Sequence, residues 1–162
     1  MTMTATKTTV PVGVRVVSVL LLAGSAIGWL WAYMVGSSAW HDARSLGVAV
    51  CIAAVPLFGW AAVKAIDLWR GRPSGYRSAA WLFAAQIPIV SIGRWTYEFS
   101  MGASARFSLG DTGRHFGGDI GSSLNLFSLT PHGWMVGVNI VALAIATYLV
   151  TVIKRQRVAL VK

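Results

Sequence analysis

The chain has 162 residues, of which 56% are apolar and 12% charged, and its mean hydropathy is +0.64. Soluble domains carry about twice that share of charged residues, so we expect a single domain that lies largely in lipid. The formal net charge of +9 does not indicate nucleic-acid binding, because the Lys and Arg residues lie at the ends of apolar segments rather than in one water-facing patch.

Two apolar segments in the first half of the chain predict membrane-spanning helices. Residues 14–36 contain one charge, Arg15, and are long enough to cross about 30 Å of hydrocarbon. A cleaved signal peptide is the alternative, but its apolar region is usually only about 7–15 residues long. Residues 46–66 form the second segment, and we expect Pro56 to kink it. This segment holds the single cysteine, Cys51, so an internal disulfide is excluded.

Two further segments, residues 78–99 and 134–153, predict the third and fourth spans. Pro88 lies near the middle of the third, and the basic run 154–157 follows the fourth. A backbone exposed to lipid must satisfy its own hydrogen bonds, and the alternation typical of barrel strands is not evident, so we expect helices. The predicted fold is all-α: a polytopic membrane four-helix bundle in one domain, 1–162, with a long non-cytoplasmic loop at 100–133.

The distribution of basic residues predicts the orientation. With both termini in the cytoplasm, ten of the fourteen Lys and Arg residues lie on the cytoplasmic side. This bias follows the positive-inside rule. We therefore expect an integral protein of the bacterial inner (cytoplasmic) membrane, with its N-terminus and C-terminus inside.

The predicted outer loop is too apolar for complete disorder. Ala105, Phe107 and Leu109 alternate with polar residues, which indicates a short strand. Residues 122–129 are typical of a short helix at the lipid surface. The two Gly-Asp sequences, at 110–113 and 118–121, predict turns.

Six polar residues are candidates for interaction or ligand binding. Arg94 and Glu98 are four residues apart, which on a helix would form an ion pair at the outer mouth. His41 and His132 lie on the predicted outer side and could join in a shallow site. Gln86 and Asn139 are expected to bond between helices, to different partners, because their depths would differ by roughly 10 Å.

Small residues recur at every fourth position of the first segment: Gly24, Gly28, Ala32 and Gly36. Such a stripe allows another helix to approach closely. Packing within the same chain is the first interpretation, and docking to another membrane protein or a second copy is the alternative.

The sequence contains no motif of the common enzyme classes, so we assign no catalytic residue, metal ligand or cofactor. The leading hypothesis is a protein that acts in the lipid bilayer by protein–protein contact, as an accessory subunit, assembly factor or protective protein. The alternatives are a small-molecule, metal or haem site at the outer mouth of the bundle, or a small transporter. An absence of acidic residues at the centres of the spans disfavours the transporter.

Overall fold

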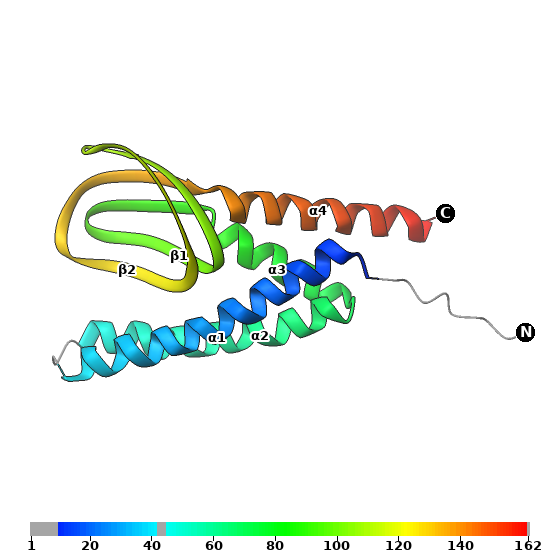
Figure 1. Cartoon of the computed structure of the whole chain (residues 1–162), viewed down its shortest axis with the longest axis horizontal. Helices are drawn as coiled ribbons and strands as arrows, with labels where there is room; N and C mark the ends of the chain where they lie inside the picture. The colour runs from blue at the N-terminus through cyan, green and yellow to red at the C-terminus, as the bar shows by residue number, and fades with distance from the viewer. Residues whose placement is uncertain (1–9, 42–44, 162) are drawn as a thin grey trace, which may run out of the picture.

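The computed structural model describes residues 10–41 and 45–161, and the side chains of these residues except those of 45, 127–132 and 157–161. Within these ranges the fold is mixed α/β, with four helices and an antiparallel sheet. The predicted all-α four-helix bundle is therefore wrong. Figure 1 shows the first two helices side by side along the length of the molecule, with the sheet beside one half of them and the last two helices beside the other half.

The first two helices, α1 (Val12–His41) and α2 (Ser45–Trp69), form an antiparallel pair, as the sequence predicts. In the described part of the chain, only these two helices are long and apolar enough to cross a membrane. Pro56 lies inside α2, and the kink expected there stays a prediction. A tight turn with Gly71 at φ 72° follows α2, and the carboxylate of Asp67 closes this turn by accepting hydrogen bonds from Lys64 (3.0 Å) and Arg72 (2.9 Å).

The third helix, α3 (Pro73–Ala85), ends well before residue 99, where the sequence predicted its end. Ile87 precedes Pro88, and a proline disfavours the helical conformation in the residue before it. Strand β1 (Pro88–Gly110) begins at that proline, in a segment rich in β-branched residues. The prediction of a helix over 78–99 is therefore correct for 78–85 and wrong beyond it.

The predicted fourth span also divides into a strand and a helix. Strand β2 (Gly113–Asn139) continues through 134–139, and α4 (Ile140–Val161) begins only after it. The expectation that an apolar run must be helical failed because strand pairing also satisfies the backbone: residues 135–138 lie between 88–91 and 107–110 and pair with both.

The predicted outer loop, 100–133, is mostly strand. The strand at 105–109 and the turn at Asp111-Thr112 are confirmed. The surface helix at 122–129 and the turn at 118–121 are wrong, because both segments belong to β2. Paired backbone groups stabilise these segments as strands despite their glycine content.

The β1–β2 hairpin is folded back on itself (Figure 1). Its bend lies where Gly102, at φ 91°, faces Gly121. We call residues 98–102 and 121–125 the inner ribbon, and residues 88–92, 103–110, 113–120 and 134–139 the outer sheet. The inner ribbon lies against the helices: Phe99 contacts Phe58 of α2, with ring centroids 6.5 Å apart.

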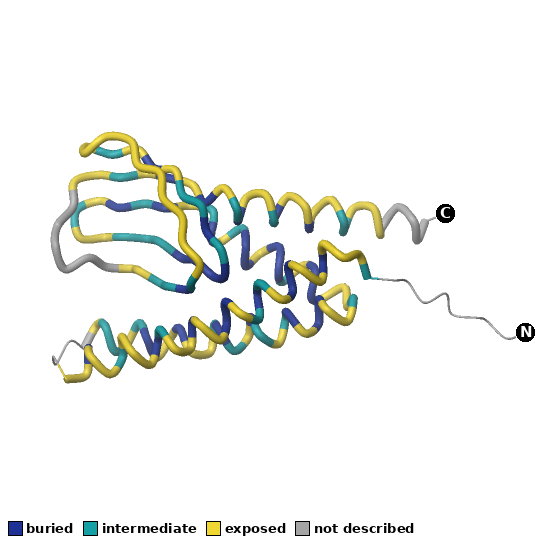
Figure 2. The backbone as a smooth tube through the Cα atoms, in the orientation of Figure 1, coloured by how far each residue is buried: buried dark blue, intermediate teal, exposed yellow. Residues whose placement is uncertain are grey.

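The core lies where the helices meet the inner ribbon, and Figure 2 shows buried residues along these contacts. Its largest fully buried side chains come from all four helices and from β1: Leu21, Phe58, Tyr76, Phe83, Met101 and Leu149. The hairpin therefore shares one hydrophobic core with the helices.

Candidate functional site

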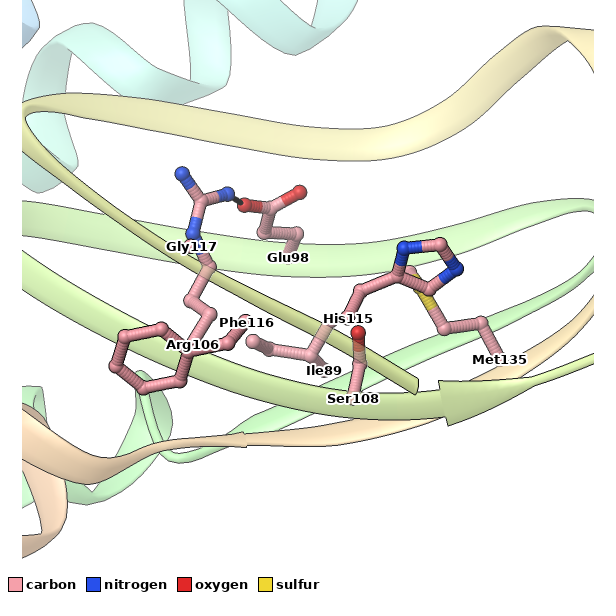
Figure 3. Close-up of a pocket in the computed structure, with 8 residues that line it drawn as sticks. All are labelled: Ile89, Glu98, Arg106, Ser108, His115, Phe116, Gly117 and Met135. Carbon is pink, nitrogen blue, oxygen red and sulfur yellow. Dashed lines mark ion pairs between the residues drawn. The ribbon is translucent and has the colours of Figure 1, made fainter. Parts of the chain in front are cut away.

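A partly polar cavity of about 200 Å³ lies between the outer sheet and the inner ribbon. Figure 3 shows its lining, with Glu98 of the ribbon facing Arg106 of the sheet. These two side chains form an ion pair, and both are mostly shielded from solvent. The remaining lining residues are Ile89, Ser108, His115, Phe116, Gly117 and Met135. The space between the two layers is thus partly polar, unlike the interior of a water-soluble β-sandwich.

Each charged group of this cavity has a partner within the chain. Arg106 pairs with Asp119 as well as with Glu98. Asp119 also accepts a hydrogen bond from Ser104 (3.2 Å), and Nε2 of His115 bonds Oγ1 of Thr112 (2.8 Å). The network joins the inner ribbon to two segments of the outer sheet, so its evident role is to hold the layers together.

The ion pair predicted between Arg94 and Glu98 is wrong in its geometry. Both residues lie on β1, where four residues span about 13 Å. The prediction required a helix, which would place them on adjacent turns. Glu98 pairs with Arg106 instead. The sequence indicates only part of this arrangement: the alternation over residues 105–109 predicts the strand that carries Arg106.

The two candidate histidines do not form a described site. His41 is exposed at the end of α1. His132 belongs to β2, and its side chain lies outside the described residues. Among the described residues, no group of three or more His, Cys, Asp or Glu side chains is arranged to hold a metal ion.

Gln86 and Asn139 are both buried at junctions between helix and sheet. Gln86 follows α3; its side chain accepts a hydrogen bond from the backbone N–H of Met101 (2.9 Å) and donates to the carbonyl of Leu82 (3.2 Å). Beside it, the hydroxyl of Tyr97 donates to the carbonyl of Ala85 (2.6 Å), and burial raises the pKa of Tyr97. Gln86 thus fixes the inner ribbon to the end of α3.

Asn139 has the corresponding role at the start of α4. Its Oδ1 accepts hydrogen bonds from the N–H groups of Ala142 (3.2 Å) and Ala105 (3.4 Å), so it caps the helix and binds β1. Its own N–H donates to the carbonyl of Ile87 (2.8 Å). The predicted separation in depth between Gln86 and Asn139 is therefore wrong, because Ile87 and Asn139 are directly bonded.

The small-residue stripe packs within the chain. A Cβ on Gly24 would lie 2.5 Å from the backbone nitrogen of Gly102, and one on Gly28 would lie 2.4 Å from the ring of Phe58. Ala32 is buried, and Gly36 faces Cys51 of α2. These contacts are all made within the chain, and at Gly24 the close neighbour is a strand, not the helix that the stripe predicted.

The face of the outer sheet opposite Arg106, Ser108 and His115 is apolar and exposed, and of its side chains Phe116 also borders the cavity. Cross-strand pairing places Phe107 beside Phe116 and Ala103 beside Ile120. Phe116 is 75% exposed and Ile120 is 85% exposed. The other large exposed side chains of this apolar outer face are Ile92, Leu109, Trp134, Val136 and Val138. A patch of this kind marks a surface that meets lipid or another protein.

This face ends at an exposed strand edge. Residues 113–120 pair with 103–110 on one side, and the described residues pair with them nowhere else. All residues from 111 to 120 are exposed. Sequence reasoning missed this edge because it assigned these residues to a loop.

The cavity, the two junctions and the apolar outer face are therefore the features from which a function must be argued. Comparison with known protein families, with characterised proteins and with solved structures finds no match to this chain.

Proposed function

We propose that the chain is an integral protein of the bacterial cytoplasmic membrane that acts by binding another membrane protein. The binding surface is the apolar outer face together with the strand edge at 113–120. The observation that carries the proposal is the unpaired edge, because its end at Ile120 lies close to the middle of a helix long enough to span the bilayer.

The depth of the edge follows from contacts with α1. The hydroxyl of Ser122 donates to the carbonyl of Gly24 (2.6 Å), and Gly24 also touches Gly102. Gly24 lies near the middle of the 30-residue helix α1. The edge segment ends at Ile120, immediately before the bend at Gly121. If α1 crosses the bilayer, the end of the edge at Ile120 therefore lies at the depth of the hydrocarbon.

An unpaired strand edge is not stable in hydrocarbon, because each unsatisfied backbone group there costs several kcal/mol. A strand from another protein would satisfy these groups by extending the sheet. The side chains of Phe116 and Ile120 lie on the same face of the strand, on either side of Gly118. The strand edge at 113–120 and the apolar outer face are adjacent, so one partner protein can contact both.

The orientation with both termini in the cytoplasm draws support from the basic residues. Arg15 and Arg77 lie in the first half of α1 and α3, and Lys64 and Lys154 lie in the second half of α2 and α4. Figure 1 shows these helix ends at the end of the molecule away from the sheet. The positive-inside rule then places this end in the cytoplasm and the sheet in the outer half of the membrane.

Site-specific photo-crosslinking in intact membranes tests the proposal. A benzophenone amino acid at Ile120 is expected to give one reproducible protein adduct, whereas the same group at Ile52, which is 67% exposed on α2, gives none. An adduct of twice the chain's mass would identify a second copy as the partner. Equal protein labelling from both positions, or lipid adducts alone from Ile120, would overturn the proposal.

A small-molecule site at the outer end is the second candidate, and the partly polar cavity beside Glu98 and Arg106 favours it. With about 200 Å³ the cavity is smaller than the roughly 300–1,000 Å³ of most ligand pockets. Its charges are already paired. Absorbance spectra and metal analysis of the purified protein test this candidate directly.

A further inference from the structure

A second surface, at the opposite end of the molecule, has the chemistry of a lipid site. A groove of about 470 Å³ runs between α3 and α4. Arg77, Trp81 and Ala84 line it from α3, and Ala146, Val150 and Lys154 line it from α4; Ala80 and Ile153 complete the lining. Its volume lies within the range of about 300–1,000 Å³ found for small-molecule pockets.

The groove is apolar along its length and basic at one end. Ala84 and Ala146 lie at the end near the sheet, and their small side chains leave the space open. Arg77 and Lys154 lie at the other end, toward the start of α3 and the last turns of α4. No acidic residue is among the lining residues. Such a groove is complementary to a molecule with an anionic head and an apolar tail.

We infer that the groove binds an anionic phospholipid of the cytoplasmic leaflet, with the phosphate between Arg77 and Lys154 and an acyl chain along Ala80, Ala84 and Ala146. The inference rests on the membrane insertion proposed above. Basic sites between helices on the cytoplasmic side are known to hold anionic headgroups. Trp81 is 75% exposed at the rim, a position that tryptophan favours at membrane interfaces.

Native mass spectrometry of the full chain, released from vesicles of phosphatidylglycerol and phosphatidylethanolamine in equal amounts, tests the inference. We expect one retained phosphatidylglycerol per chain. Each cation near an anionic headgroup increases the affinity for that lipid about fivefold. The double variant Arg77→Gln/Lys154→Gln should therefore lose roughly 25-fold of the preference for phosphatidylglycerol over phosphatidylethanolamine. The matched control Arg70→Gln/Arg155→Gln removes the same charge from exposed positions outside the groove and should retain the preference.

A second readout separates the site from general charge attraction. Phosphatidylglycerol with brominated acyl chains should quench Trp81, measured as the difference between the wild-type protein and Trp81→Phe, more strongly than brominated phosphatidylethanolamine. Equal quenching by both lipids, or equal losses in the two double variants, would overturn the inference. If the protein inserts into vesicles and resists carbonate extraction but does not prefer phosphatidylglycerol to phosphatidylethanolamine, the lipid site is refuted and membrane insertion is not. If the protein does not insert, both are refuted. Displacement of the bound lipid by inorganic phosphate alone would show an anion site without a place for the acyl chain, which also overturns it.

Discussion

Replacing Gly24 by alanine tests the contact that positions the sheet. In the wild-type structure, a Cβ at this position would lie 2.5 Å from the nitrogen of Gly102, 2.6 Å from Cγ of Met101 and 2.9 Å from the carbonyl carbon of Met101. Two of these three atoms belong to the backbone, so rotation of a side chain cannot relieve the clash. The inner ribbon must move away from α1 instead.

Gly59→Ala is the matched control, because its Cβ would meet only Cζ2 of Trp29, at an ordinary 3.5 Å. Both substitutions replace a helical glycine and gain the same helix propensity, about 1 kcal/mol. The difference between the two variants therefore isolates the overpacking at Gly24, about 1–3 kcal/mol. For a chain of this size, that corresponds to a difference in Tm of about 2–12 °C.

Thermal unfolding in mild detergent, followed by size-exclusion chromatography of the surviving fraction, measures this difference. We expect Gly24→Ala to unfold at the lower temperature. Adding Met101→Ala should restore only part of the loss, because the backbone atoms of the ribbon remain in place. Equal midpoints for Gly24→Ala and Gly59→Ala would refute the packing of the inner ribbon on α1.

Three further predictions concern the polar residues of the fold. Gln86→Leu leaves the buried N–H of Met101 without an acceptor and should cost about 1–3 kcal/mol of unfolding free energy, whereas Gln156→Leu, at an exposed position, should change it little; denaturant titration of both variants decides this. Asn139→Ala removes the cap of α4 and should lower the free energy of unfolding by about 1 kcal/mol or more, whereas Asn125→Ala, at an exposed position, should change it little. A loss of stability in Asn125→Ala alone would contradict the role of Asn139 as the cap. In a double-mutant cycle, Glu98→Gln and Arg106→Gln together should destabilise less than the sum of the single changes, because each single change already removes the Glu98–Arg106 ion pair, while the contact of Arg106 with Asp119 is lost only with Arg106; additive effects would show that Glu98 and Arg106 do not interact.

The sequence was sufficient to predict α1 and α2. Both are long apolar runs without internal charges near their centres, and local helix formation satisfies their backbones wherever the rest of the chain lies. The stripe that begins at Gly24 indicated a position where another segment could approach closely, but not that this segment is a strand, because small residues permit the approach of any neighbouring backbone.

The sheet could not be predicted in the same way, because its pairing is non-local. Residues 88–92 meet 134–138, more than forty residues away, and no short-range pattern records that contact. An apolar run that becomes half helix and half strand has the same composition as one continuous span. Local signals did exist in the Ile87-Pro88 dipeptide and the β-branched residues that follow it.

The prediction of the candidate site was wrong for the same reason, because it assumed a helix where the chain forms strand β1. Once residues 94–98 are strand and not helix, the pairing of Glu98 changes from Arg94 to Arg106. Gln86 and Asn139 were correctly singled out as buried polar residues, but their partners are the backbone groups of β1 and the helix ends. Residue identity was thus predictable, whereas partners required the register of the strands.

Pairing between residues 109 and 136 tests the central claim most directly, namely that the two segments expected to be loop and spanning helix are adjacent strands. Leu109 and Val136 face one another in the register, and both side chains lie on the apolar outer face. In a background with Cys51→Ala, the pair Leu109→Cys/Val136→Cys should form a disulfide rapidly under mild oxidation in membranes, because facing residues bring Cα atoms within about 4.5–5.5 Å. The control pair Leu109→Cys/Met135→Cys points to opposite faces and should form it slowly. No disulfide in the first pair, or equal rates in both, would contradict the fold and every site described on it.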